Sequence, residues 1–258
     1  DIEEERDMAN WKMEKEGVFC EIDGPVAIFK VNRPQTKNGM DWKAKGAQAE
    51  AYERIAADPD VRVMVITAEG EYFITGGRVD ASKPEEQKLY SEYIARVENA
   101  RKTIKVPMIA AVNGHCFKGG MGLVAQADLA VAKETATFSF PEVRMGGVPM
   151  VVMARCMGYL PKKLALEAYY SNREYPAKRM YEVGFLNAVT DEEHFWPTVE
   201  EYIHMVIDYP RSLIQMTHDA YYAMEGITDL NERVAFSQKW LAEKVLPQMA
   251  KEKTSYNV

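Results

Sequence analysis

The stretch that decides the fold is residues 110–132, AAVNGHCFKGGMGLVAQADLAVA, with the run TFSFPEVRMGGVP at 137–149 close behind it. Its apolar pattern predicts a strand at 107–112, a buried glycine-rich helix at 119–127 and a second strand at 128–132. The first N–H groups of such a helix have no helical partners, so the loop before it can hold a polarised or negatively charged oxygen. Gly119 and Gly120 have no Cβ to keep that oxygen away.

A second glycine turn, YFITGGRVD at 72–80, also follows an apolar run, at 61–67. Neither turn has the GK[ST] of a Walker loop or the GxGxxG spacing of a dinucleotide loop. Two glycine turns that each follow a strand can aim two N–H groups at one oxygen, which is the geometry of an oxyanion hole. On these turns alone, simple packing of a helix against a strand remains an open alternative.

Four ordered blocks carry a family resemblance: NRPQTKNGM at 32–40, YFITGG at 72–77, AAVNGHCFKGGMG at 110–122 and SFPEVRMGGVP at 139–149. Together they resemble the crotonase superfamily of enoyl-CoA hydratases and isomerases, from about residue 17 to about residue 189. Within it, the sequence looks most like the hydroxycinnamoyl-CoA hydratase-lyases. The resemblance implies an α/β fold, the crotonase (ClpP/crotonase-like) spiral of ββα units. It also implies a crotonase core at 1–190 and a C-terminal helical trimerisation region at 191–258.

Length, charge and cysteine usage limit the class of protein. A chain of 258 residues with 47% apolar residues can fill a sizeable core. The net charge of −7 argues against nucleic acid and anionic membranes as partners, and no apolar run approaches the ~20 residues of a membrane helix. Three scattered cysteines without a CxxC pair favour reduced thiols and a cytoplasmic location over a disulfide or a zinc site. We expect no metal and no cofactor, with coenzyme A entering as part of the substrate.

The remaining elements follow from periodicity and from turn residues. We predict a solvated tail at 1–11, a hairpin of strands 18–22 and 26–31, helices at 42–57 and 84–105, and a strand at 61–67. Beyond residue 149 the pattern predicts helices at 162–170, 176–183, 193–208, 210–224 and 229–249, with a strand at 185–189. The last helices are rich in aromatic residues, which either pack on their own core or form an oligomer interface. The resemblance implies a homotrimer, often paired into a hexamer.

The resemblance also assigns the catalytic groups. The backbone N–H groups of Gly77 and Gly119 would stabilise the enolate of a thioester, and Glu142 would carry the proton. Superfamily hydratases commonly use two glutamates, and the position of the first is Gly122 here. Met150 stands where glycine is usual in the loop at 149–152. These two departures favour a single-acid enzyme, either a double-bond isomerase or a hydroxycinnamoyl-CoA hydratase-lyase, over an aliphatic hydratase.

Three residues near the glycine turns are candidate auxiliary groups. Lys118 replaces a glycine of the family, so its ammonium can bind a carboxylate, a phosphate or an enolate, or extend to solvent. His115 is either an acid or base or a hydrogen-bonded core residue. Arg78 replaces the usual acidic residue after the oxyanion position, and its charge favours an anionic substrate.

Further residues are candidates for binding the acyl-CoA. Gly76, Gly120, Gly122 and Met150 are expected along the acyl group. Tyr90 is either a wall of the acyl pocket or a core residue. Lys37 and the backbone at 33–38 are expected to hold coenzyme A.

Two alternative functions remain open. Lys118 and His115 can serve decarboxylation or C–C bond hydrolysis of a β-keto or malonyl-type thioester, with Glu142 secondary. The glycine at position 122 also fits a non-catalytic acyl-CoA binder.

Overall fold

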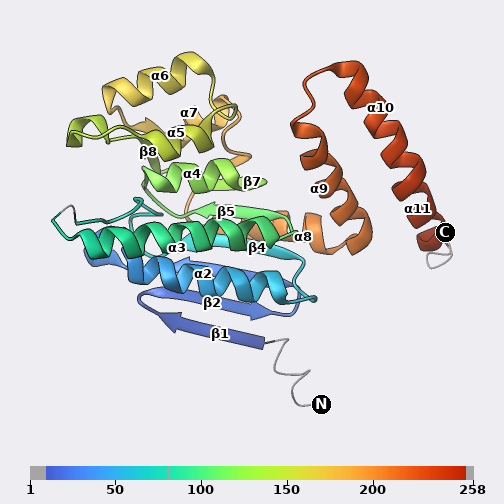
Figure 1. The fold of residues 1–258 in the computed structure, drawn as a ribbon, viewed down its shortest axis with the longest axis horizontal. Helices are drawn as coiled ribbons and strands as arrows, with labels where there is room; N and C mark the ends of the chain where they lie inside the picture. Colours follow the sequence, from blue (N-terminus) through green and yellow to red (C-terminus); the bar gives the residue numbers. More distant parts are fainter. Residues whose placement is uncertain (1–9, 81, 254–258) are drawn as a thin grey trace. The chain divides into compact units, whose positions relative to one another are not determined.

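The computed structural model describes residues 10–80 and 82–253 of the chain, whose fold Figure 1 shows. The strands are β1 (Asn10–Lys15), β2 (Val18–Asp23), β3 (Val26–Val31), β4 (Val63–Ala68), β5 (Met108–Val112), β6 (Cys116–Phe117), β7 (Leu129–Lys133), β8 (Thr137–Ser139), β9 (Tyr175–Pro176) and β10 (Ala188–Thr190). The α-helices are α2 (Trp42–Ala57), α3 (Pro84–Thr103), α4 (Gly119–Gln126), α5 (Met150–Cys156), α6 (Lys162–Ser171), α7 (Ala177–Glu182), α8 (Phe195–Ile207), α9 (Arg211–Glu225), α10 (Leu230–Trp240) and α11 (Leu246–Lys253). Short 3₁₀ turns lie at Pro34–Thr36 and Val143–Met145, and a π-helical segment, Leu241–Val245, joins α10 to α11.

The main sheet has seven strands in the order β1-β2-β3-β4-β5-β7-β10. Strands β1, β2 and β3 are antiparallel, which confirms the predicted hairpin, and the sheet is parallel from β3 to β10. Because the carboxyl ends of parallel strands meet at one edge, the loops after β4 and β5 lie side by side. This edge carries both glycine turns.

Helices α2 and α3 pack against each other (Figure 1). A helix-starting residue marks the beginning of each. The carboxylate of Asp41 accepts the N–H of Ala44 and so caps α2, which has the predicted bounds. Pro84 occupies the first turn of α3, where its missing N–H costs nothing. These two helices and α5 supply side chains to the candidate site.

The first described residues correct the prediction of a solvated tail. Residues 10–15 form β1, paired along its whole length with β2. Trp11 and Met13 alternate with the exposed Lys12 and Glu14, so one face of a highly charged strand is partly buried. The rest of the predicted tail lies outside the described residues.

A small second sheet, β6-β8-β9, was missed because its strands are only two or three residues long. The loop expected at 149–152 is also wrong, since α5 begins at Met150. Both elements shape the site, because β8 leads directly to Glu142 and α5 covers α4.

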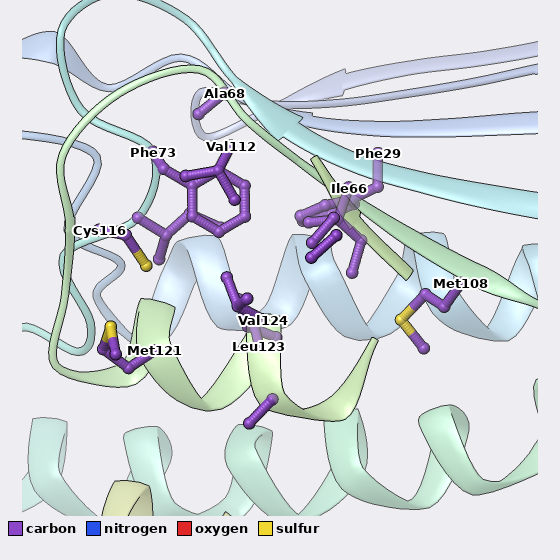
Figure 2. Close-up of a cluster of buried hydrophobic side chains, with 14 of the residues drawn as sticks. Phe29, Ile66, Ala68, Phe73, Met108, Val112, Cys116, Met121, Leu123 and Val124 are labelled. Atoms are coloured by element: carbon purple, nitrogen blue, oxygen red, sulfur yellow. The ribbon is translucent and has the colours of Figure 1, made fainter. Parts of the chain in front are cut away.

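The core lies around α4 and the central strands. Figure 2 shows Met121 and Val124 of α4 close to Phe73 and Val112, whose side chains come from the two loop-bearing segments. All four are buried. The glycine-rich helix is thus anchored by its apolar side chains, which leaves its first turn free to face a cavity.

Contacts divide the chain into residues 1–203 and residues 204–258. The division falls within α8, whereas the sequence placed the end of the core at residue 190. In the second unit no residue of α9 or α10 is buried. We find no candidate for a membrane-spanning helix in the part of the chain that the structure describes.

Candidate active site

The two loops that follow β4 and β5 are joined by a ladder of backbone hydrogen bonds. His115 N–H donates to Glu71 O (2.9 Å), Phe73 N–H to His115 O (2.9 Å) and Phe117 N–H to Ile74 O (3.2 Å). The loops therefore run in parallel until they reach Gly77 and Gly119. Gly120 is required by this approach, because a Cβ there would lie 2.0 Å from the carbonyl oxygen of Ile74.

The backbone N–H groups of Gly77 and Gly119 lie close together at the end of this ladder. An ideal Cβ on Gly119 would be 4.0 Å from the nitrogen of Gly77, and one on Gly76 would be 2.9 Å from the nitrogen of Gly119. Within the described residues, neither N–H donates to another backbone carbonyl. Two free donors this close can stabilise a single developing oxyanion.

The Tyr90 hydroxyl of α3 lies against Gly77, at the position where a side chain on that residue would begin. A Cβ on Gly77 would lie 1.7 Å from the Tyr90 hydroxyl oxygen, so no side chain fits at position 77. Burial raises the pKa of the Tyr90 phenol to about 12. The hydroxyl is therefore protonated at neutral pH and stays beside the Gly77 N–H as a further possible donor.

Glu142 follows β8, which is tied to the start of α4 by a bond from Lys118 N–H to Ser139 O (3.1 Å). Its Oε2 atom is buried and has no hydrogen-bond partner among the described residues. Burial raises the pKa of the Glu142 carboxyl above its ordinary value, against the opposing effects of its own backbone N–H and of the Lys118 ammonium. A carboxyl whose pKa is raised in this way is a better base than an exposed one and can take up and return a proton.

The chain neighbours of Glu142 are apolar in sequence, but they supply only part of its apolar setting. Phe140 is buried, but Val143 and Met145 are 45% and 67% exposed. The apolar cover comes instead from Pro149 and Val152, two buried residues that line the same cavity as Glu142.

One cavity of about 400 Å³ is lined by Gly76, Gly77, Gly119 and Glu142 together. Tyr90, Lys118 and Met150 also line it, so most of the predicted site residues gather here. A larger cavity of about 1190 Å³ shares Gly77, Tyr90 and Lys118 with it and is lined further by Lys37 and Arg78. The two spaces thus meet at the Gly77 turn, with room for a small group in one and a long group in the other.

Lys118 has an unusual backbone for a residue with a side chain, with φ 51° and ψ −122°. The Lys118 Cβ atom lies 2.9 Å from the position that a Cβ on Gly76 would occupy. The two glycine turns are therefore in close contact at Lys118. A left-handed φ in a non-glycine residue costs roughly 1–3 kcal/mol and concentrates at functional sites. The surrounding ladder holds the lysine in this conformation.

Three predicted residues do not line either cavity. The His115 Nδ1 atom lies 2.8 Å from Thr137 Oγ1, and the ring stacks on Phe117 at 6.0 Å between centroids. Gly120 packs against Ile74, as described above. Gly122 is covered by Arg155, because a Cβ on Gly122 would lie 2.9 Å from the Arg155 Cδ atom.

Four polar residues of the smaller cavity were not predicted from the sequence: Lys45 and Gln48 of α2, Glu98 of α3 and Arg155 of α5. Arg155 forms an ion pair with Glu98, and the Lys45 ammonium donates to Gln48 Oε1 at 2.8 Å. No motif contains these residues. The one available signal was the i, i+3 spacing of Lys45 and Gln48 on a predicted helix, and that spacing is too common to indicate a site.

The three cysteines and the acidic residues form no further site. Cys20, Cys116 and Cys156 are free and buried. Burial raises the pKa of Cys20 to about 12, which keeps its thiol protonated. Among the described residues, no group of three or more His, Cys, Asp or Glu side chains is placed to hold a metal ion.

Comparison with known proteins gives the family. The enoyl-CoA hydratase/isomerase family model matches residues 21–254. The chain belongs to the enoyl-CoA hydratase/isomerase family. Carnitinyl-CoA dehydratases of Salmonella, including those of Salmonella typhi and Salmonella agona, are 28% identical over 199 residues, which is 75% of this chain and 75% of theirs.

Solved structures agree on the crotonase fold. An enoyl-CoA hydratase from Mycobacterium smegmatis superposes with a TM-score of 0.80 at 24% identity, over 96% of this chain and 95% of that one. The enoyl-CoA hydratase subunit I of Geobacillus kaustophilus has a TM-score of 0.81 at 25% identity, over 94% and 95%. A neighbour from Thermobifida fusca, solved in complex with CoA, has a TM-score of 0.77 at 22% identity, over 91% and 95%.

Proposed function

We propose that this member of the enoyl-CoA hydratase/isomerase family moves a proton at the double bond of an acyl-CoA thioester. The thioester oxygen would accept the N–H groups of Gly77 and Gly119, and Glu142 would carry the proton to and from the acyl carbon. The observation that carries this proposal is the meeting of these three groups in one cavity. No cofactor is needed beyond the coenzyme A of the substrate.

The raised pKa of Glu142 suits this role, because a carboxylate that is less stable when charged is a stronger base toward carbon. Two preorganised N–H donors can stabilise the enolate by several kcal/mol. The base and the donors would thus act on neighbouring atoms of the same thioester.

A second acid beside Glu142 is absent at the family position, and the packing gives a physical reason. Arg155 occupies the space over Gly122, and the other carboxylate of the cavity, Glu98, pairs with Arg155 and with Arg101. Glu98 is therefore engaged by two guanidinium groups rather than free to hold a water molecule. This supports a single-acid reaction, either double-bond isomerisation or the hydration and cleavage typical of hydroxycinnamoyl-CoA hydratase-lyases.

Coenzyme A would occupy the larger cavity, with Lys37 and Arg78 as its positive groups. The family and the CoA complex of the Thermobifida neighbour support an acyl-CoA substrate, and the two positive side chains support this cavity for its phosphates. We further propose a homotrimer or hexamer built on the C-terminal unit, supported by the exposure of Tyr221 (64%) and Leu230 (67%) there.

The test is exchange of solvent deuterium into Cα of a bound saturated acyl-CoA, followed by mass spectrometry. We expect exchange with the wild type and a loss of 10²-fold to 10⁴-fold in the exchange rate for Glu142→Gln. Glu134→Gln, a change at an exposed glutamate in the turn after β7, serves as the matched control. Tight binding without exchange by the wild type would identify a non-catalytic binder instead.

Decarboxylation of a malonyl-type thioester is a second candidate, favoured by one observation. Lys118 lines the cavity beside Glu142 and keeps a strained backbone to do so. His115, the other residue of this hypothesis, lies outside both cavities. Loss of turnover in Lys118→Ala but not in Glu142→Gln would select this reaction.

Dehydration of a carnitinyl thioester, the activity in the name of the Salmonella relatives, is less well supported. A carnitinyl group carries a quaternary ammonium, and the cavity already contains the cations of Lys45 and Arg155. Like charges in a partly desolvated space repel.

A further inference from the structure

The smaller cavity has a polar cluster on residues that the proposed chemistry does not use: Lys45, Gln48, Glu98 and Arg155. These residues line this cavity and not the larger one, whereas Gly77, Tyr90 and Lys118 line both. The polar cluster therefore lies away from the junction where coenzyme A would enter. An acyl chain that starts at the oxyanion donors would extend toward it.

Positive charge is in excess at the polar cluster. The Glu98 carboxylate pairs with two guanidinium groups, those of Arg155 and Arg101. The Lys45 ammonium donates to a neutral acceptor, the Oε1 atom of Gln48. Three cations thus gather around one carboxylate, in a protein whose net charge is −7. A partly buried cation without its own counter-charge is costly, and the other carboxylate of the cavity, Glu142, forms no ion pair with Lys45, so an added anion would stabilise this cluster.

Two further observations point the same way. Burial, and then the Arg155 guanidinium, lower the pKa of the Lys45 ammonium to about 8, so its charged form is destabilised. Gln48, which accepts from this ammonium, is a fully buried neutral amide that also lies against the buried Tyr52 hydroxyl, so it does not supply the missing negative charge. An oxygen anion would satisfy the ammonium, whereas an apolar acyl group would not.

We propose that the polar cluster binds a carboxylate at the far end of the acyl chain through Lys45 and Arg155, so that the substrate is the coenzyme A monothioester of a dicarboxylic acid. This inference rests on the proposed function, because it takes the thioester to lie at Gly77 and Gly119. It goes further by naming the substrate class.

The fold also limits the length of the chain. Arg155 packs on Gly122, which is three residues beyond Gly119 and so about 4.5 Å farther along α4. An extended carbon chain advances roughly 1.3 Å per bond, given C–C bonds near 1.5 Å. A diacid of about four to six carbons would therefore place its second carboxylate beside the polar cluster.

The experiment is calorimetric titration with saturated thioesters, which bind without completing a reaction at a double bond. Succinyl-, glutaryl- and adipyl-CoA are compared with butanoyl-, pentanoyl- and hexanoyl-CoA of matching length. We expect at least one diacid thioester to bind about tenfold or more tightly than its partner. Lys45→Met and Arg155→Met should each remove this preference, whereas Lys43→Met, at an exposed lysine of the same helix, should keep it.

Each other outcome is decisive. Equal or weaker binding of the diacid thioesters by the wild type would overturn the inference and leave the proposed function intact. Failure of all six thioesters to bind would overturn both. A preference that survives Lys45→Met and Arg155→Met but disappears in Lys118→Met would place the carboxylate at the junction and overturn the assignment to the polar cluster. Should Arg155→Met not fold, as judged by circular dichroism, Lys45→Met decides alone.

Discussion

The two ends of the smaller cavity are built in different ways. At one end, the N–H groups of Gly77 and Gly119 belong to the backbone, and a ladder of main-chain hydrogen bonds fixes their position. At the other end, Lys45, Glu98 and Arg155 reach in as side chains from three different helices. A backbone site tolerates many sequences as long as the chain path is kept, whereas a side-chain site changes with a single substitution. The first end thus suits a chemistry shared by a family, and the second suits the choice of substrate.

We expect the largest loss of activity from Gly77→Ala, which alters the backbone end of the smaller cavity. The new Cβ would meet the Tyr90 hydroxyl at 1.7 Å, so the Tyr90 side chain, α3 or the turn must move, and a shift of the turn would displace the Gly77 N–H. Loss of one oxyanion donor typically lowers kcat by about 10²-fold to 10³-fold. Turnover of an enoyl-CoA substrate measures the effect.

The double change Gly77→Ala with Tyr90→Phe is the matched control for this clash. Removing the hydroxyl relieves the shortest contact, so we expect part of the activity to return. Full activity in Gly77→Ala alone would show that the Gly77 turn does not position a donor.

Gly122→Glu tests whether Arg155, from the side-chain end, excludes an acid from α4. The change introduces the first acid of the two-glutamate hydratases. The new side chain would meet Arg155, which is held by its pair with Glu98. Overpacking of this kind destabilises by about 1–3 kcal/mol. Urea unfolding at a fixed protein concentration measures it.

In an Arg155→Ala background the same Gly122→Glu change should cost less, because the obstructing side chain is gone. Gly226→Glu is the control, since nothing lies within 4 Å of a Cβ there. An equal cost of Gly122→Glu with and without Arg155 would show that the arginine does not exclude the acid.

The pH dependence of turnover connects Glu142 with its neighbour Lys118. The acid Glu142 must lose its proton to act as a base, so kcat/KM should rise with pH through its elevated pKa. The Lys118 ammonium lowers that pKa, so Lys118→Met should move the acid limb to higher pH. The shift should be small, because Lys118 has the least effect of the three influences on this pKa. A limb that moves to lower pH would contradict the assignment of Glu142 as the base.

The sequence predicted the residues of the backbone end of the smaller cavity but not those of the side-chain end. The glycine turns and Glu142 lie in contiguous motifs, so their place in the chain already fixed their place at one sheet edge. Helix α2, the hairpin and the parallel strands followed from periodicity and capping in the same way.

The polar cluster could not be predicted, because its residues are spread over more than a hundred positions and meet only through packing of α2, α3 and α5. Strand β1 was missed because its charged alternation resembles a solvated tail. The roles of Gly120 and His115 were equally hidden, since a motif shows that a residue is present and not which way it faces. The domain boundary at residue 190 and the trimer remain predictions.

The smallest expected effect is on stability and concerns Lys118, a residue next to the backbone donor Gly119 that also places a side chain in the cavity. Its side chain lines both cavities, and its backbone has φ 51°. Glycine adopts this conformation freely, whereas a residue with a Cβ is strained by roughly 1–2 kcal/mol. The greater freedom of glycine in the unfolded chain offsets about 0.4–1 kcal/mol of that gain. We therefore expect Lys118→Gly to raise the free energy of unfolding by about 1 kcal/mol or less.

Lys118→Ala separates the two contributions, because alanine keeps the Cβ and loses the ammonium. The stability difference between the alanine and glycine variants reports the backbone strain less the unfolded-chain contribution of glycine, and the difference in activity between wild type and alanine reports the loss of the lysine side chain beyond its Cβ. If the glycine variant is more stable than the wild type yet less active, the strain is maintained for the sake of the ammonium. A glycine variant that is both less stable and equally active would mean that the lysine is simply a well-packed residue, and its charge would then have no part in the site.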